Sequence, residues 1–131
     1  MTKNLQIRII TPLDVLLEQE ATLVTMPGEE GEFGVLPMHV PLIASLKPGL
    51  VKISSVNQNV SYFVWGGIAR VSDSNVDIIT EFAIDIASTN KNVTLETISN
   101  LKDSLNHEAE IDKQEQLKVE LLKFETLFTY L

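Results

Sequence analysis

The chain has 131 residues, a formal net charge of −8 and no cysteine. This length fits one domain, or a compact core with an attached helical piece, and the apolar runs are far shorter than the roughly 20 residues that span a bilayer. The composition excludes disulfides and thiolate metal sites, and with Arg8 and Arg70 as the only arginines it leaves no basic stripe for nucleic acid. We therefore expect a soluble protein with no nucleic-acid partner, no direct insertion into lipid and no cofactor.

The first segment predicts a half-buried strand. Leu5, Ile7 and Ile9 alternate with Gln6 and Arg8, which directs the two sets of side chains to opposite faces of a sheet. The first ten residues lack the basic start, apolar middle and small-residue cleavage site of an export signal, so we expect no targeting segment.

Short strands separated by turn residues follow as far as about Asp85. Pro27-Gly28 indicates one turn, and residues 47–49 (Lys-Pro-Gly) indicate a type II turn, because proline fixes one φ angle and glycine accepts a positive one. Two further polar clusters are typical of hairpin tips, Asn57-Gln58-Asn59 and Asp73-Ser74-Asn75. The pattern predicts an all-β sandwich of about ten short strands.

A pair of glycines, Gly66 and Gly67, interrupts the β-branched and aromatic run over residues 60–71. Glycine inside a strand costs stability, so a pair of them indicates a bulge, a sharp bend or the close approach of another backbone. The sequence alone does not choose among these three.

The composition changes after Asp85, where a polar stretch begins and glycine and proline do not occur again. We place a domain boundary there, with the all-β domain over residues 1–86 and a helical domain over residues 87–131. Asn92 is the expected N-cap of a first helix, and Asn106-His107 the break before a second. The apolar positions expected to be buried are Leu95, Ile98, Leu101 and Leu105 in the first helix and Leu117, Leu121, Phe124, Phe128 and Leu131 in the second. An antiparallel two-helix hairpin would bury both stripes against each other.

Little in the chain suggests catalysis. His39 and His107 fall in different predicted domains, and no Walker, dinucleotide or nucleophile-elbow motif is present, so we expect no metal site, no nucleotide site and no catalytic residues. Glu29, Glu30 and Glu32 surround Gly31 in a compact acidic loop. Taken by itself, that loop could be a solvated turn, a weak cation site or half of an acid–base pair.

One long segment carries a resemblance to a known family. Residues 27–37 (PGEEGEFGVLP), His39, Pro41-Leu42-Ile43 and the Lys-Pro-Gly of residues 47–49 resemble the signature of the epsilon subunit of bacterial ATP synthases. Gly66-Gly67-Ile68 resembles a later strand of the same family, and the helical tail falls where that family has a C-terminal hairpin. The resemblance is strong to about Ile79 and holds only in outline afterwards.

The resemblance implies a non-catalytic central-stalk (rotor) subunit of a proton-translocating ATP synthase, which couples rotation of the c-ring to the gamma subunit. It implies a peripheral location on the cytoplasmic side of the inner membrane, and it leaves open a contact of the C-terminal helices with the catalytic beta subunits. The residues that the resemblance assigns to the c-ring are Glu29, Glu30, Gly31, Glu32 and Phe33. Those that it assigns to gamma are Met38, His39, Val40 and Pro41.

The chain departs from the family pattern in three places. Met38 and Val40 replace the usual glycine and alanine beside the histidine. The Ile-Asp-x-x-Arg-Ala motif that binds ATP in some members is absent, because Ile84-Asp85 is not followed by it and no arginine occurs after Arg70. Residues 107–131 carry six acidic residues against three lysines, and the like charges would repel the acidic segment that inhibitory members of the family contact. We therefore expect no ATP site and weak or no inhibition by the helices.

Two other functions remain open from the residues alone. The chain could be a free-standing β-sandwich that binds a ligand in a loop cleft and dimerises through its helical hairpin. It could also be a hydrolase that uses Glu29, Glu30 or Glu32, if a second carboxylate or a histidine stands opposite in a cleft.

Overall fold

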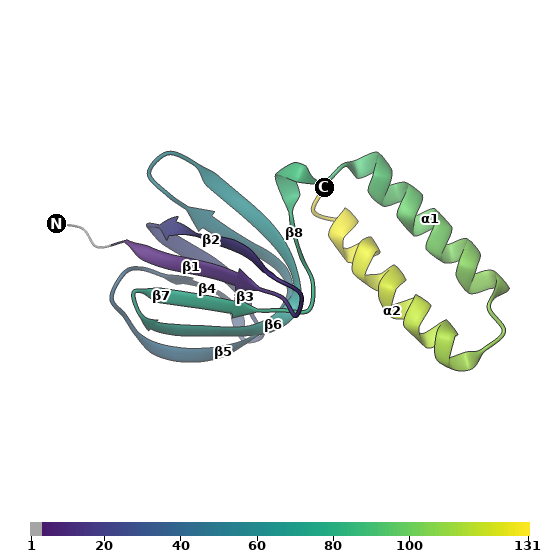
Figure 1. The fold of residues 1–131 in the computed structure, drawn as a ribbon, viewed down its shortest axis with the longest axis horizontal. Helices are drawn as coiled ribbons and strands as arrows, with labels where there is room; N and C mark the ends of the chain where they lie inside the picture. The colour runs from purple at the N-terminus through teal and green to yellow at the C-terminus, as the bar shows by residue number, and fades with distance from the viewer. Residues whose placement is uncertain (1–3) are drawn as a thin grey trace. The chain divides into compact units, whose positions relative to one another are not determined.

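The computed structural model describes residues 4–131 as two compact units that separate between Ala87 and Ser88. Residues 1–3, part of the segment in which we expect no export signal, lie outside the described residues. The first unit holds eight strands (Figure 1), which are β1 (Leu5–Ile10), β2 (Val15–Ala21), β3 (Leu23–Gly28), β4 (Gly31–Val35), β5 (His39–Ser54), β6 (Asn59–Asp73), β7 (Asn75–Ile79) and β8 (Ala83–Asp85).

Two long strands build both layers of the β unit. β5 and β6 form an antiparallel hairpin whose register is constant from the Leu42–Val71 pair to the Ser54–Asn59 pair. β6 pairs with β8 over its first half and with β7 over its second half. One layer is therefore β4, β3, the end of β5, the start of β6 and β8, and the other is β2, β1, β7, the end of β6 and the start of β5. The predicted β-sandwich is confirmed, but with eight strands in place of about ten, because β5 and β6 bend from one layer into the other without ending.

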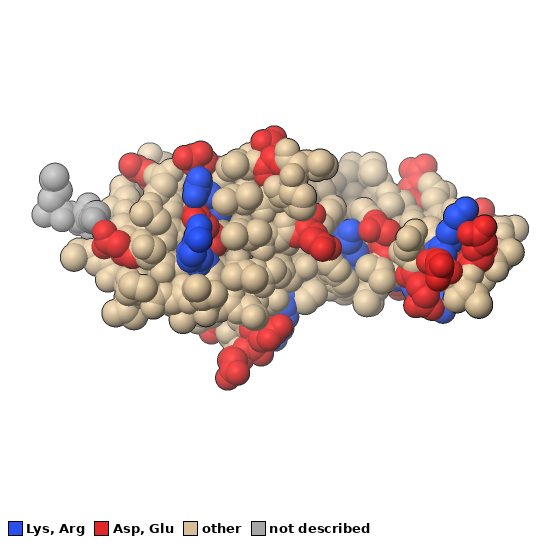
Figure 2. Space-filling model, turned by 60° about the horizontal axis from the view of Figure 1, so that its bottom comes forward, with Lys and Arg blue, Asp and Glu red and all other residues tan. Residues whose placement is uncertain are grey.

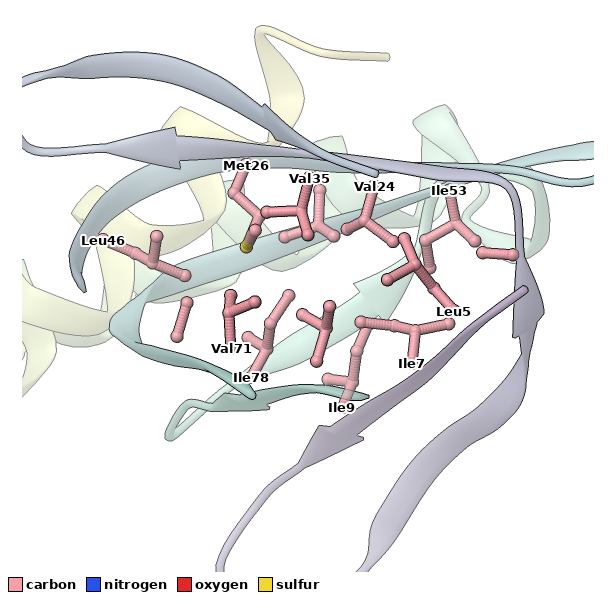
Figure 3. Packing of buried hydrophobic residues seen from close by; sticks show 14 of the residues in the cluster. Leu5, Ile7, Ile9, Val24, Met26, Val35, Leu46, Ile53, Val71 and Ile78 are labelled. Carbon is pink, nitrogen blue, oxygen red and sulfur yellow. The ribbon is translucent and has the colours of Figure 1, made fainter. Parts of the chain in front are cut away.

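The core lies between these two layers. Leu5, Ile7 and Ile9 are fully buried, as their alternation with Gln6 and Arg8 predicts. Figure 3 shows the facing side chains, with Val24, Met26, Val35 and Ile53 of one layer directed toward Ile7, Ile9, Val71 and Ile78 of the other. Burial of this many large apolar side chains is the main stabilising contribution to the unit.

One predicted turn that contains proline is wrong, and another is displaced. Residues 47–49 lie inside β5, where Pro48 stands opposite Trp65. A proline is tolerated there because the pairing of β5 with β3 is interrupted between Leu46 and Lys52, so the missing N–H falls at a gap in that ladder. Pro27-Gly28 likewise ends β3, and the turn follows at Glu29 and Glu30.

The glycine pair is explained by a close approach of backbones at the bend of β6. Gly66 and Gly67 have φ angles of 73° and 128°, which side chains rarely adopt. A Cβ atom on Gly67 would overlap the carbonyl oxygen of Ile79, and one on Gly66 would lie 3.2 Å from the carbonyl oxygen of Leu46. Glycine at residue 67 therefore lets β7 pass directly beside β6.

The second unit is an antiparallel pair of helices, α1 (Lys91–His107) and α2 (Ile111–Phe128), preceded by a 3₁₀ turn at Ile86–Ser88. The predicted hairpin is confirmed: the two helices pack on each other, and the Lys91 ammonium lies 5.3 Å from the ring centre of Phe128 at the opposite chain end of the pair. Neither helix in the described part of the chain is long and apolar enough to cross a membrane.

Details of the helices differ from prediction. The N-cap is Asn90 and not Asn92, since the Asn90 side-chain oxygen accepts hydrogen bonds from the N–H groups of Asn92 and Val93 at 2.8 and 3.1 Å. Leu95 is exposed, and Thr94 takes its place on the buried stripe with Ile98. The remaining predicted positions are half-buried: Leu101, Leu105, Leu117, Leu121, Phe124, Phe128 and Leu131.

Candidate partner-binding surfaces

The acidic loop forms a rigid tip between β3 and β4. Glu29 and Glu30 make the turn, and the Glu29 N–H donates a 3.0 Å hydrogen bond to the Ser45 carbonyl of β5. Gly31 has a φ angle of 130°. A Cβ atom on Gly28 would lie 2.7 Å from the Gly31 carbonyl oxygen, so the backbone is tightly folded here. Three exposed carboxylates, on Glu29, Glu30 and Glu32, define what we call the acidic tip.

Phe33 supports the acidic tip from behind. Its ring is half-buried, packs against the core and lies within 3 Å of where a Gly28 Cβ atom would stand. The tip borders an open groove whose other wall is residues 42–45 of β5. In Figure 2 a group of carboxylates stands out from the lower edge of the β unit, against a surface that is mostly uncharged.

An exposed apolar strip runs along residues 36–43, from the end of β4 into β5. Its members, which we call the apolar strip, are Leu36 (60% exposed), Met38 (71%), Val40 (71%) and Ile43 (73%). An irregularity in the pairing between His39 and Leu42 turns this part of β5 away from a regular ladder. Contiguous exposed apolar side chains of this kind mark partner interfaces in soluble proteins.

Local hydrogen bonds fix the strip. Met38 has a φ angle of 64°, unusual for a residue with a side chain, and its N–H donates to the Ser74 hydroxyl at 3.3 Å. The His39 Nδ1–H donates to the Val40 carbonyl at 2.6 Å. Pro41 is exposed within the irregular pairing. The four residues assigned to gamma by resemblance are thus contiguous in the chain, three of them exposed and His39 half-buried.

The geometry gives no support to an active site at the acidic tip. The groove beside it is lined by the tip itself, Phe33 and residues 42–45, so it brings in neither His39 nor a carboxylate from another strand. Within residues 4–131 no three His, Cys, Asp or Glu side chains are grouped so that they could hold a metal ion. Tyr62 and Trp65, the aromatic residues that a ligand-binding cleft would use, belong to β6.

A row of charges on the outer face of the second layer was not predicted. Arg8 Nε and Nη2 donate to the two Asp77 carboxylate oxygens at 2.9 and 3.0 Å, and Arg70 Nη2 donates to one of them at 3.3 Å. The hydrogen bonds from Arg8, with a smaller contribution from Arg70, hold the pKa of Asp77 below its ordinary value although burial opposes the shift. The sequence predicted the outward position of Arg8. It could not predict the bond to Asp77, because the two residues are 69 positions apart in the chain.

Comparison with known proteins identifies the β unit. Residues 4–86 match the family described as ATP synthase, Delta/Epsilon chain, beta-sandwich domain. The ATP synthase epsilon chain of Rickettsia felis is 46% identical over 94 residues, covering 70% of this chain and 84% of that one. The epsilon chain of Rickettsia typhi is 41% identical over 91 residues, covering 67% and 83%.

Solved structures share the whole fold. A chain in the Euglena gracilis mitochondrial ATP synthase (OSCP/F1/c-ring, rotational state 1) superposes with a TM-score of 0.72 at 22% identity, covering 97% of this chain and 81% of that one. A chain in the central stalk/c-ring structure of the Tetrahymena thermophila mitochondrial ATP synthase gives 0.58 at 14% identity, covering 97% and 98%. At these identities the likeness concerns the fold alone.

The family match spans more than half of the chain, and curated relatives above 40% identity cover two thirds of it. The predicted resemblance is therefore confirmed. The chain belongs to the ATP synthase delta/epsilon family, as a non-catalytic chain of the epsilon type.

Proposed function

We propose that the β unit couples rotation of the c-ring to the gamma subunit in the central stalk of a proton-translocating ATP synthase. The observation that carries the proposal is the presence of two exposed surfaces of different chemistry on neighbouring strands, the acidic tip and the apolar strip. They are joined through the Glu29–Ser45 hydrogen bond and the shared groove wall at residues 42–45. A load applied to one surface therefore reaches the other through paired strands. In this role the chain is a peripheral subunit on the cytoplasmic side of the inner membrane.

The acidic tip is the proposed contact with the c-ring. Its carboxylates stand on a turn held by backbone bonds and by glycine geometry, so little conformational freedom is lost when it docks. Charge complementarity with polar or basic loops then sets the register of the two partners more than it adds affinity. Glu29, Glu30, Gly31 and Glu32 form this surface, and Phe33 holds it against the core.

The apolar strip is the proposed contact with gamma. Met38, Val40 and Pro41 are exposed around His39, and Ile43 continues the surface along β5. Burying these side chains against a partner supplies about 25 cal/mol for each Å² of apolar surface removed from water. None of these residues belongs to the core of the β unit, so a partner can cover them without disturbing that core.

Separate variants of the two surfaces test the proposal. Replacing Glu29, Glu30 and Glu32 with Gln should leave binding to an α₃β₃γ assembly intact but weaken retention on the c-ring and lower ATP-driven proton pumping. Val40→Asp should instead weaken binding to α₃β₃γ. Glu20→Gln combined with Glu96→Gln and Glu125→Gln, which also removes three exposed carboxylates but none from the acidic tip, is the charge-matched control. If wild-type protein fails to bind α₃β₃γ, or if neither variant alters assembly, the proposal is wrong.

The helices are proposed to act as a folded prop with weak or no inhibitory action. Each of the three lysines of α2 already pairs with the glutamate three residues before it, Lys113 with Glu110 at 3.7 Å, Lys118 with Glu115 at 3.4 Å and Lys123 with Glu120 at 2.8 Å. Few cations are left to contact an acidic partner on the catalytic beta subunits. Deleting residues 92–131 should therefore change ATP hydrolysis by the assembled enzyme by less than about twofold, a barrier change under 1 kcal/mol. A large rise in hydrolysis would show that the helices inhibit.

No nucleotide site is proposed in this chain. The Asp85 carboxylate accepts a hydrogen bond from the N–H of Ala87 at 3.0 Å, so it serves the local turn before the helices. A ligand that binds only the folded state raises the melting temperature. Since we expect no ATP binding, millimolar ATP should leave the melting temperature of the isolated chain unchanged. A rise in melting temperature specific to ATP would overturn this expectation.

A further inference from the structure

The charge row on the outer face continues into apolar residues at one end. Cross-strand pairing places Glu18 opposite Arg8, Arg8 opposite Asp77, Asp77 opposite Arg70, and Arg70 opposite Ile43. Directly opposed residues of neighbouring strands share a face of the sheet. The row therefore alternates in charge across β2, β1, β7 and β6 and ends on the exposed Ile43 of β5.

Arg70 is the less engaged of the two arginines in this row. Asp77 is held by two short bonds from Arg8 and one longer bond from Arg70, and its side chain is 12% exposed, whereas the Arg70 side chain is 58% exposed. A guanidinium has five N–H donors, and the bond to Asp77 occupies one of them. Most of the hydrogen-bonding capacity of Arg70 thus faces outward.

Exposed isoleucines frame this cation. Ile43 lies opposite Arg70 on β5, Ile68 precedes it by two residues on the same face of β6, and Ile79 of β7 lies opposite Ile68. They are 73%, 49% and 44% exposed. We call Arg70 with these three residues the Arg70 site. A single cation within an apolar frame has the composition of an interface centre, where apolar contacts exclude water around one charge pair.

We propose that the Arg70 site is the charged anchor of the gamma-binding surface and receives a carboxylate that gamma presents between apolar side chains. The inference rests on the proposed function, since it extends the gamma contact. Continuity supports gamma as the occupant: Ile43 belongs to both the apolar strip and the Arg70 site, so one partner surface covers both. A free anion would gain nothing from the isoleucines, which favours a protein partner.

Arginine suits this role better than lysine. Its planar guanidinium can hold Asp77 on one edge and a partner carboxylate on another, and the pairing gains strength when isoleucines exclude water. Asp77 keeps both bonds from Arg8 when Arg70 is changed. The fold of the β unit should therefore survive substitution at residue 70.

The test is titration of the full chain into an α₃β₃γ assembly prepared without it, at low and at high salt. Arg70→Gln should weaken binding roughly tenfold or more and reduce the salt dependence, and Ile68→Ser should weaken it several-fold. Arg70→Lys should recover only part of the loss. Lys52→Gln, an exposed cation on the other layer, is the matched control and should bind within about twofold of wild type. Circular dichroism and the melting temperature establish that each variant is folded.

The outcomes separate this inference from the function on which it rests. If the wild-type chain does not bind α₃β₃γ, the proposed function fails. If the wild type binds and folded Arg70→Gln and Ile68→Ser bind equally well, only the Arg70 site is refuted. A loss that appears with the c-ring present, but not with α₃β₃γ alone, would also overturn the assignment to gamma.

Discussion

The β unit and the helical unit are held together in different ways. In the β unit, fifteen residues in one buried cluster join strands that are far apart in sequence, such as β1 with β7. In the helices, Thr94, Ile98 and Leu127 are the buried residues, and the rest of both stripes is half-buried. The first unit therefore depends on long-range packing, and the second on helical propensity, one cap and a narrow seam.

This difference predicts unequal stability. Isolated helices of this length are marginal in water, and two helices with a narrow seam add little burial. The β unit has a closed two-layer core and is also the part that the family match covers. We expect it to behave as the rigid body of the protein, while the helices open at lower free energy.

The largest expected effect comes from Gly67→Ala. The new Cβ would overlap the Ile79 carbonyl oxygen, a backbone atom that cannot move without breaking the β6–β7 pairing. Gly31→Ala is a close control, because its φ of 130° matches the 128° of Gly67 but nothing lies within 4 Å of its Cβ. Gly31→Ala should cost roughly 1–3 kcal/mol for backbone strain alone, and Gly67→Ala at least about 2 kcal/mol more, up to loss of folding. Urea unfolding measures the free energy of unfolding of both variants. Equal losses of stability would show that β7 can shift away from β6 to make room for the new Cβ.

Parallel truncations in the two units sharpen the contrast. Ile7→Ala should lower the free energy of unfolding of the β unit by about 3–4 kcal/mol, whereas Ile98→Ala should cost about 2 kcal/mol at most because its seam can collapse. Fluorescence of Trp65, the single tryptophan, reports on the β unit, and helical circular dichroism reports on the helices. Ile98→Ala should shift the helical transition and leave the Trp65 transition in place. Coincident shifts would show that the two units unfold as one.

The sequence predicted the β unit where side-chain alternation decides the structure. Leu5, Ile7 and Ile9 were placed in the core by period alone, and the hairpin tip at Ser74 by turn chemistry. Prediction failed at Pro48, because proline signals a turn unless a ladder gap on the neighbouring strand accommodates it, and that gap is set by β3. The strand number was wrong because β5 and β6 each bend from one layer into the other without ending.

For the candidate surfaces, the sequence located individual segments but not the contacts between segments that are distant in the chain. The acidic tip and residues 38–41 are each contiguous in sequence, so a motif could locate them. The Arg70 site joins residues of β5, β6 and β7, which no single motif covers. The role of Asp77 follows only from the pairing of β7 with β1, which places Asp77 opposite Arg8. Parallel pairing of β1 with β7 is not encoded in any local pattern.

The charge row adds a pH dependence confined to the β unit. Hydrogen bonds from Arg8 and Arg70 depress the pKa of Asp77, so its contribution is complete above the unfolded-state pKa of about 3.9. That contribution is lost as the pH falls through the lower folded-state pKa. Asp77→Asn should cost about 1 kcal/mol at neutral pH, since the side chains of its partners Arg8 and Arg70 are 41% and 58% exposed. It should also flatten the fall of the Trp65 transition below about pH 4. Arg70→Gln should keep most of that fall, because Arg8 supplies two of the three bonds. Parallel profiles for wild type and Asp77→Asn would contradict the assignment.

The smallest effect separates stability from binding at Met38. Its φ of 64° is strained for a residue with a side chain, and Met38 is 71% exposed, so it adds little burial to the folded chain. Met38→Gly should therefore raise the free energy of unfolding by about 0.5–1 kcal/mol, the left-handed penalty less the entropy that glycine adds to the unfolded state. Met38→Ala keeps the strain and should gain nothing. If Met38 contacts gamma, Met38→Gly should also weaken binding to α₃β₃γ while Tm rises. Higher stability with weaker binding is the result expected of a side chain that is kept at a strained position for its contact with gamma. Unchanged binding would show that Met38 takes no part in the contact made by the apolar strip.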